Sequence, residues 1–167
     1  MKLGIMARDL GAVLKQRGET VAVSESSTGG LISAALLSVP GASAYFLGAG
    51  VIYTGAARSA LLELPAKLPA DTRSASEPYA ALCASRIREK LGATWGLAET
   101  GASGPTGNRY GDAAGHCCLA VSGPMERIQT LETGSDDREA NMWIFARAAI
   151  DLLAEAIDNA SAIVPPD

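Results

Sequence analysis

The sequence predicts an α/β protein: a three-layer α/β/α sandwich in which helices cover both faces of a mixed, mostly parallel β-sheet. Segments rich in β-branched residues alternate along the chain with segments whose apolar residues recur at helical spacing. Near the end, two strand-like segments follow each other directly, which adds an antiparallel hairpin to the sheet. At 167 residues, the chain is expected to form one domain over 1–167, and its hydrophobic content of 48% supports a sizeable core.

Each expected element has a local signal. Helical or alternating apolar spacing gives its type, and Gly or Pro marks its end. Ser76, followed by Glu77 and Pro78, is expected to cap a helix. The expected elements, in chain order, are a helix over 5–17, a strand over Thr20–Ser24, a helix over 28–38, a strand over Leu47–Tyr53, a helix over 55–63, a helix from 77 to about Leu91, a strand over Thr94–Thr100, strands over Gly115–Val121 and Arg127–Glu132, and a helix capped by Ser135 or Asp136 that reaches about Ile157.

The charge balance restricts the partners of this chain. A net charge of −4 and a pI near 5.0 argue against a general nucleic-acid binder, because no basic stripe offsets phosphate repulsion. One anionic small ligand held by one or two arginines remains compatible with this balance. The sequence has neither a secretory signal pattern nor an apolar run of about 18 residues, so we expect no membrane partner and a cytoplasmic location.

The three cysteines and the single histidine do not form a convincing metal site. An odd number of cysteines does not make a disulfide framework. His116, Cys117 and Cys118 are expected on one strand, where adjacent side chains point to opposite faces and converge poorly on one ion. Cys83 belongs to a separate helical stretch. We therefore expect buried structural cysteines, no metal, and His116 as a strand residue rather than a catalytic base.

The segment from Val21 to Gly30 carries the strongest local signal of a functional site. A β-branched run ends at Ser24, and hydroxyl-bearing residues and two glycines precede an apolar helical run. This pattern is typical of a strand, a tight elbow and a helix N-terminus, where a hydroxyl can face a ligand beside free backbone N–H groups. Ser26 is therefore a candidate nucleophile; the alternative is that it only caps the helix.

The neighbours of Ser26 have two interpretations each. Glu25 is expected either to orient a ligand or to be an ordinary carboxylate of the first helical turn. Gly29 and Gly30 allow either close backbone approach to a ligand or close packing of helix on strand.

Two further loops follow expected strands, and ligands of open α/β sheets bind beyond the carboxyl ends of strands. One is Tyr53–Arg58, and the other is the glycine-rich loop Thr100–Gly107. The glycine-rich loop matches neither a phosphate-binding P-loop nor a dinucleotide fingerprint, so a plain turn is an equal alternative. Arg58, Arg109 and Arg138 are possible anion partners, with solvated surface charges as the alternative.

Six motifs, in the same order along the chain, resemble those of the CinA C-terminal domain family, the nicotinamide mononucleotide deamidases. The segment Glu25-Ser26-Ser27-Thr28-Gly29-Gly30 is similar to the family's E-S-C-T-G-G. The other five similar segments are Pro40–Phe46 (P-G-S-S-A-Y-F), Val51–Thr54 (V-x-Y-S), Ser76-Glu77 (V-S-E), Thr100–Pro105 (T-G-I-A-G-P) and Asp137-Arg138 (G-D-R). The resemblance covers a core of about 5–158, and it implies a stand-alone version of a domain that full-length CinA proteins carry behind another one.

The resemblance implies an activity and a set of site residues. It implies hydrolysis of the carboxamide of nicotinamide mononucleotide to nicotinic acid mononucleotide and ammonia, without a cofactor. It places the nucleophile at Ser26, a tyrosine at Tyr53 and the family's catalytic lysine at the position of Arg58. The positions expected to bind substrate are Glu25, Ser27, Thr28, Gly29, Gly30, Thr100, Gly101, Ser103, Gly104 and Arg109.

Several positions depart from the family pattern. Arginine stays protonated in proteins, so Arg58 cannot replace a lysine as general base, although it can hold a phosphate or carboxylate. The family cysteine is Ser27 here, and the asparagine that follows Y-S is Gly55. The glycine loop is shortened to Gly107–Gly115, with Arg109 near the position of a missing lysine.

Two hypotheses follow. In the first, the protein is an amidohydrolase with Ser26 as nucleophile, and Tyr53 or a water held by Glu25 is the base. In the second, it is a catalytically impaired nucleotide-binding protein, because Arg58 replaces the lysine. The expected partner is a small-molecule nucleotide in both, and Ala-rich helices make a homo-oligomer possible.

Overall fold

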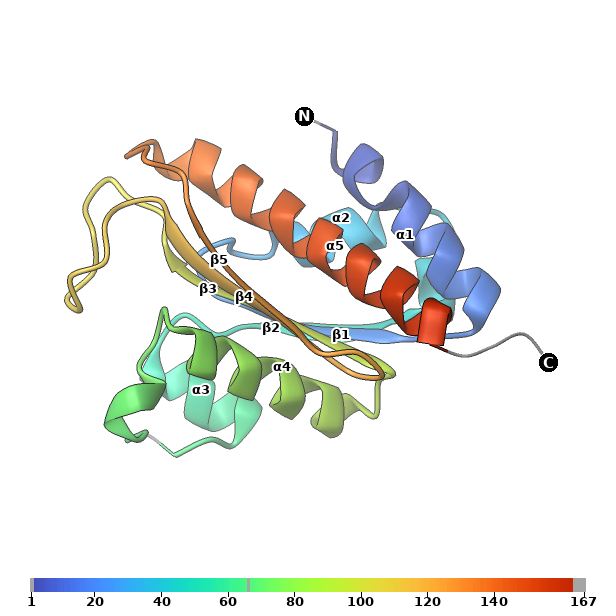
Figure 1. Ribbon diagram of the computed structural model, residues 1–167, viewed down its shortest axis with the longest axis horizontal. Helices are drawn as coiled ribbons and strands as arrows, with labels where there is room; N and C mark the ends of the chain where they lie inside the picture. Colours follow the sequence, from blue (N-terminus) through green and yellow to red (C-terminus); the bar gives the residue numbers. More distant parts are fainter. Residues whose placement is uncertain (1, 66, 164–167) are drawn as a thin grey trace.

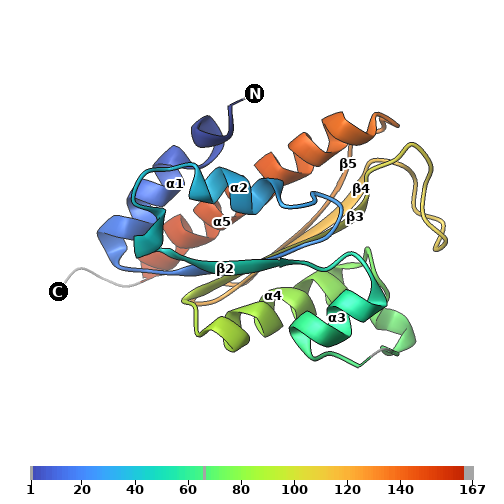
Figure 2. The same ribbon diagram turned by 180° about the vertical axis from the view of Figure 1, so that it is seen from behind.

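The computed structural model describes residues 2–65 and 67–163, and in this part the chain forms a five-stranded sheet between two helical layers (Figures 1 and 2). Helices α1, α2 and α5 cover one face, and α3 and α4 cover the other. The predicted α/β/α sandwich is therefore confirmed. The elements are α1 (Leu3–Arg17), β1 (Val21–Glu25), α2 (Leu31–Leu37), β2 (Phe46–Val51), α3 (Gly55–Leu62), α4 (Glu77–Leu91), β3 (Trp95–Ala102), β4 (His116–Ser122), β5 (Arg127–Glu132) and α5 (Arg138–Ile163), with short 3₁₀ turns η1 (Ala42–Ala44) and η2 (Ala70–Thr72).

The strand order is β2-β1-β3-β4-β5. Strand β1 pairs in parallel with both β2 and β3, whereas β4 pairs antiparallel with both β3 and β5. Strand β4 is therefore the one strand of this sheet that runs against the others, as expected for a late hairpin on a parallel sheet. Because β1, β2 and β3 run in the same direction, the loops that follow them leave from the same end of the sheet.

The two sheet faces differ in the size of their side chains. The face under α1, α2 and α5 buries large residues such as Tyr45, Trp95 and Phe145. The face under α3 and α4 buries mainly small ones, including several alanines and Cys83. Small side chains let α4 pack close to β3: a Cβ placed on Gly96 would lie 2.0 Å from the backbone oxygen of Ala84. Among the described residues, no helix is both long and apolar enough to cross a membrane.

The structure corrects the starts of two predicted helices, and α5 also continues to Ile163, past the predicted end near Ile157. Helix α2 begins at Leu31 rather than 28, because Gly29 and Gly30 have φ of +63° and +105° and form a turn before it. Helix α5 begins at Arg138, and its cap is Asp137 rather than Ser135 or Asp136, because the Asp137 carboxylate accepts a hydrogen bond from the backbone N–H of Ala140 at 3.0 Å.

The close packing of α4 on β3 predicts that Gly96→Ala destabilises the protein by about 2–3 kcal/mol, since a backbone oxygen cannot move aside as a flexible side chain does. The measurement is the free energy of unfolding in urea. The control is Gly4→Ala in α1, whose added Cβ would meet Ser38 Oγ at an ordinary 3.5 Å. Equal stabilities of the two variants would contradict the prediction.

Candidate functional site

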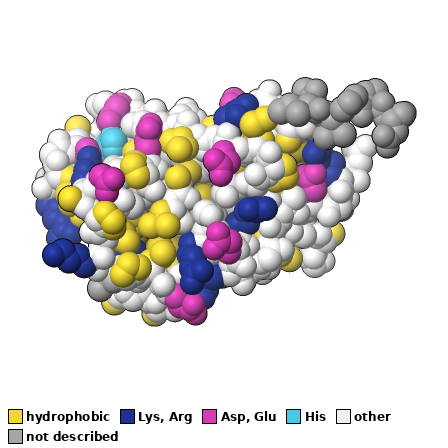
Figure 3. Space-filling model, turned by 60° about the horizontal axis from the view of Figure 1, so that its bottom comes forward, with side chains coloured by type: hydrophobic (Ala, Val, Ile, Leu, Met, Phe, Trp, Pro, Cys, Tyr) yellow, Lys and Arg dark blue, Asp and Glu magenta, His cyan; other side chains and the backbone are white. Residues whose placement is uncertain are grey.

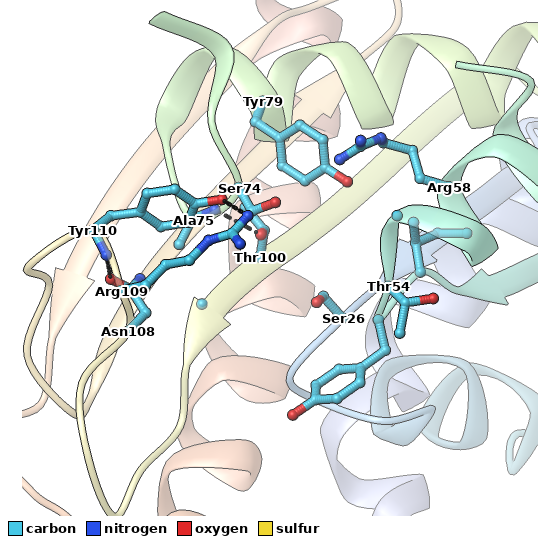
Figure 4. A pocket seen from close by; sticks show the side chains of 14 residues that line it. Ser26, Thr54, Arg58, Ser74, Ala75, Tyr79, Thr100, Asn108, Arg109 and Tyr110 are labelled. Carbon is cyan, nitrogen blue, oxygen red and sulfur yellow. Dashed lines mark hydrogen bonds between the residues drawn. The ribbon is translucent and has the colours of Figure 1, made fainter. Parts of the chain in front are cut away.

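The three predicted loops meet around one cavity of about 470 Å³ (Figure 4). Ser26 comes from the end of β1, Tyr53 and Thr54 from the end of β2, and Thr100 and Gly101 from the end of β3. The other lining residues come from the segment after β2, from α3, from the segment before α4 and its first turn, and from the glycine loop: Ile52, Gly55, Arg58, Ser74, Ala75, Tyr79, Asn108, Arg109 and Tyr110. The parallel arrangement of β1, β2 and β3 thus brings segments far apart in the sequence to one site.

Ser26 lines this cavity as a half-buried residue. Its backbone N–H donates a hydrogen bond to Glu99 Oε2 at 2.9 Å, which holds the elbow from the inside. In the part of the chain that the structure describes, its hydroxyl forms no hydrogen bond with another protein group. Figure 4 shows this hydroxyl on the cavity side, so it is available to a ligand.

The buried carboxylate of Glu25 caps helix α2. It accepts hydrogen bonds from the backbone N–H groups of Gly30 and Ile32, both at 3.0 Å, and of Ser33 at 2.8 Å. Glu25 is fully buried, and both of its oxygens are occupied, so it positions the elbow. The expected free N–H groups at this helix N-terminus are a wrong prediction, because the protein's own carboxylate takes them.

A second buried carboxylate, Glu99 on β3, holds the other half of the elbow. Besides Ser26, it accepts from the backbone N–H of Thr28 at 3.0 Å and from the hydroxyl of Ser27. The Thr28 hydroxyl lies 2.8 Å from one oxygen of Glu99 and 2.8 Å from one oxygen of Glu25, so it bridges the two carboxylates. Sequence reasoning missed Glu99; its only signal is a carboxylate inside an otherwise apolar strand.

Arg58 lines the cavity, but its guanidinium extends toward Tyr79 and away from Ser26 (Figure 4). Its Cζ lies 5.8 Å from the centre of the Tyr79 ring. Burial raises the pKa of Tyr79 far above its usual range, and burial also raises the pKa of the neighbouring Cys83 to about 11. Both groups are neutral at pH 7, and Tyr79 is a lining residue that sequence reasoning missed.

Tyr53 is largely exposed at the rim of the cavity, and its hydroxyl accepts a hydrogen bond from Arg138 Nη2 at 3.2 Å. Arg138 also donates from Nη1 to the backbone oxygen of Gly104 at 2.5 Å. Arg138 therefore links the loop after β2 to the glycine loop. Among the described residues, neither Tyr53 nor Arg58 forms a hydrogen bond with the Ser26 hydroxyl.

A second hollow of about 250 Å³ adjoins the first and shares Tyr53, Gly101 and Asn108 with it. Ser27, Ser103, Gly104 and Arg138 are among its other lining residues. Ser103 Oγ is buried and has no hydrogen-bond partner among the described residues. The structure thus brings most of the predicted substrate-binding positions to these two hollows. Glu25, Thr28, Gly29 and Gly30 lie outside both linings and shape the elbow.

The glycine loop is anchored from outside the cavity. Asp112 forms a two-pronged ion pair with Arg73, at 2.7 and 2.9 Å, and this hydrogen-bonded guanidinium lowers the pKa of Asp112. Arg109, on the same loop, stacks at 5.0 Å on the Tyr110 ring and lines the cavity as expected. The loop that carries Asn108–Tyr110 is therefore held against the segment before α4.

His116 ties the cavity wall to β5. Its Nε2 lies 3.0 Å from the backbone oxygen of Ala75, its Nδ1 contacts the Glu132 carboxylate, and Asp112 lies 3.9 Å from the ring. Both ring nitrogens face acceptors, which favours the doubly protonated ring. Burial alone lowers the pKa of His116, but the hydrogen bonds to Glu132 and Ala75 and the charge of Asp112 raise it above its ordinary value of 6.5.

The comparisons with known proteins point to a single family. A family model described as the CinA C-terminal domain matches residues 4–157. The CinA-like protein of Parasynechococcus marenigrum is 40% identical over 127 residues, which cover 76% of this chain and 30% of that protein. The CinA-like protein of Gloeobacter violaceus is 37% identical over 151 residues, which cover 89% of this chain and 35% of that protein. The chain thus spans about a third of the length of these curated relatives.

Solved structures share the fold. The competence-damaged protein (CinA) superfamily protein of Klebsiella pneumoniae superimposes with a TM-score of 0.88 at 24% identity, covering 95% of this chain and 99% of that chain. The competence or damage-inducible protein of Enterobacter asburiae superimposes with a TM-score of 0.81 at 26% identity, covering 96% of this chain and 99% of that chain.

The role of Glu99 predicts that Glu99→Gln destabilises the protein by about 2–4 kcal/mol, because an NH₂ group then faces N–H and O–H donors in a buried place. The exposed Glu126→Gln is the matched control and should leave stability unchanged. Urea unfolding of both variants checks this. A Glu99→Gln variant as stable as the control would show that the elbow does not depend on this carboxylate.

The environment of His116 predicts a pH-dependent contribution to stability. Because its folded pKa is raised, the stabilisation is fully present below its ordinary value of 6.5 and is lost as pH rises through the folded pKa. The unfolding free energies of wild type and His116→Asn, measured between about pH 5 and 9, should therefore differ most at the acid end and converge with rising pH. A difference that is constant over this range would contradict the assignment.

Proposed function

Because this chain belongs to the CinA C-terminal domain family, we propose that it hydrolyses the carboxamide of a nicotinamide nucleotide, with nicotinamide mononucleotide as the substrate. The observation that carries the proposal is the Ser26 hydroxyl, which faces a cavity from a rigid elbow and has no protein partner among the described residues. The products are nicotinic acid mononucleotide and ammonia.

The proposed reaction has two steps at Ser26. Its oxygen attacks the amide carbon, the C–N bond breaks, and ammonia leaves after it takes up a proton. Water then attacks the resulting ester, which releases the carboxylic acid and returns the hydroxyl to Ser26. The backbone N–H of Ser27, which forms no hydrogen bond within the described residues, is the candidate donor to the carbonyl oxygen that becomes negative.

The base in this proposal is Tyr53, acting directly or through a water. Arg58 cannot accept the Ser26 proton, because a guanidinium stays protonated in proteins. Glu25 does not hold a water in the cavity, because its carboxylate is buried among backbone donors. Tyr53 accepts this proton as the phenolate, and the guanidinium of Arg138, 3.2 Å from its oxygen, would stabilise that negative charge, so the contact with Arg138 is kept during the reaction.

A second candidate function is nucleotide binding without turnover. Its supporting observation is Arg58, a permanent cation at the position that the resemblance assigns to a lysine. In this version Arg58 and Arg109 hold a phosphate in the cavity, and Ser26 only contacts the ligand.

The proposed hydrolysis predicts that purified protein releases ammonia from nicotinamide mononucleotide and that Ser26→Ala lowers the rate by about a thousandfold or more. Ser85→Ala, on α4, where the hydroxyl donates a hydrogen bond to Glu89 of the same helix, is the control and should keep the wild-type rate. Saturable binding of the nucleotide without any ammonia release by the wild type would favour the second function instead. An active Ser26→Ala variant would exclude Ser26 as the nucleophile.

A further inference from the structure

Positive charge gathers around the site of an otherwise acidic chain. The sequence has 14 basic and 18 acidic residues. Of the described residues that line the two hollows and a third one next to them, five are basic and none is Asp or Glu: Arg58, Lys67, Arg73, Arg109 and Arg138. Figure 3 shows Lys and Arg side chains gathered at one end of the molecule (left). Such a hollow concentrates anions, although the whole chain repels them.

The third hollow extends the site toward the segment before α4. It has a volume of about 300 Å³ and shares Arg58, Ser74, Arg109 and Tyr110 with the main cavity. Arg58 and Arg109 therefore lie on the wall between the two spaces, and a phosphate held by both would be open to either side. Two guanidinium groups match the charge of a single phosphate, so they account for one such group.

Lys67 and Arg73 add cations beyond that wall. Arg73 is already neutralised by its ion pair with Asp112, so it shapes the hollow more than it charges it. Lys67 is exposed and forms no ion pair within the described part of the chain. The Lys67 ammonium can therefore interact with a negatively charged ligand in this hollow.

We infer that the site binds a ligand with two linked phosphates, a nucleoside diphosphate or dinucleotide. One phosphate lies between Arg58 and Arg109, and the second lies in the third hollow beside Lys67. The inference rests on the proposed function only in placing the amide end of such a ligand next to Ser26. A mononucleotide would fill the main cavity and leave the third hollow empty.

The test measures dissociation constants by calorimetry at one fixed ionic strength, because salt screens these contacts. The probes are inorganic phosphate, inorganic pyrophosphate, nicotinamide mononucleotide and nicotinamide adenine dinucleotide. Pyrophosphate should bind about tenfold more tightly than phosphate, and Lys67→Glu should remove that preference. The same variant should weaken the dinucleotide about tenfold and leave the mononucleotide within about twofold. Lys15→Ala, on α1 in the other helical layer, is the control and should change nothing.

The outcomes separate this inference from the proposed function. Equal affinities for phosphate and pyrophosphate, or equal losses of both nucleotides in Lys67→Glu, would overturn the second phosphate position. Absence of ammonia release, combined with a pyrophosphate preference that depends on Lys67, would refute hydrolysis and keep the second phosphate position. Ammonia release from the mononucleotide, combined with equal binding of phosphate and pyrophosphate, would support hydrolysis and refute the second phosphate position.

Discussion

The site depends on two buried carboxylates that bind the backbone of one short elbow. Glu25 and Glu99 together accept hydrogen bonds from the N–H groups of Ser26, Thr28, Gly30, Ile32 and Ser33. Burying a carboxylate is unfavourable unless it is fully hydrogen-bonded, and backbone N–H groups at the start of a helix supply that bonding. The backbone N–H groups of the elbow need hydrogen-bond acceptors, and the buried carboxylates need donors, so each satisfies the other. The Ser26 hydroxyl is the group that this arrangement leaves facing the cavity.

Much of the fold could be predicted from the sequence because its elements follow local rules. Helical spacing in α4, with Ser76 as its cap, is confirmed by a hydrogen bond from the Tyr79 N–H to Ser76 Oγ. The convergence of three loops could also be predicted, because successive parallel strands end on the same side of a sheet. A helix start is harder to predict where several neighbouring residues could cap it. Ser135, Asp136 and Asp137 all could cap α5, and in the structure Asp137 does so.

The parts of the site that could not be predicted depend on partners far apart in the chain. Glu99 lies more than 70 residues from the elbow that it binds, and no local pattern links the two. The contacts of Arg58 with Tyr79 and of Arg138 with Tyr53 also join residues that lie far apart in the sequence. The expectation of free N–H groups at α2 failed for this reason, since the sequence shows the donors but not the distant acceptors that occupy them.

Arg58 stands at the position where the resemblance implies a lysine, and this difference decides what the position can do. A lysine can lose its proton and accept another, whereas a guanidinium remains a fixed cation with planar donors suited to phosphate. Arg58 is therefore suited to anion binding and not to proton transfer, and the Tyr79 hydroxyl beside it is neutral at pH 7. In the proposed hydrolysis, the proton that Ser26 gives up therefore goes to Tyr53, whose hydroxyl accepts a hydrogen bond from Arg138. The proposal thus gives proton transfer to Tyr53 and anion binding to Arg58, two residues that line the same cavity as Ser26.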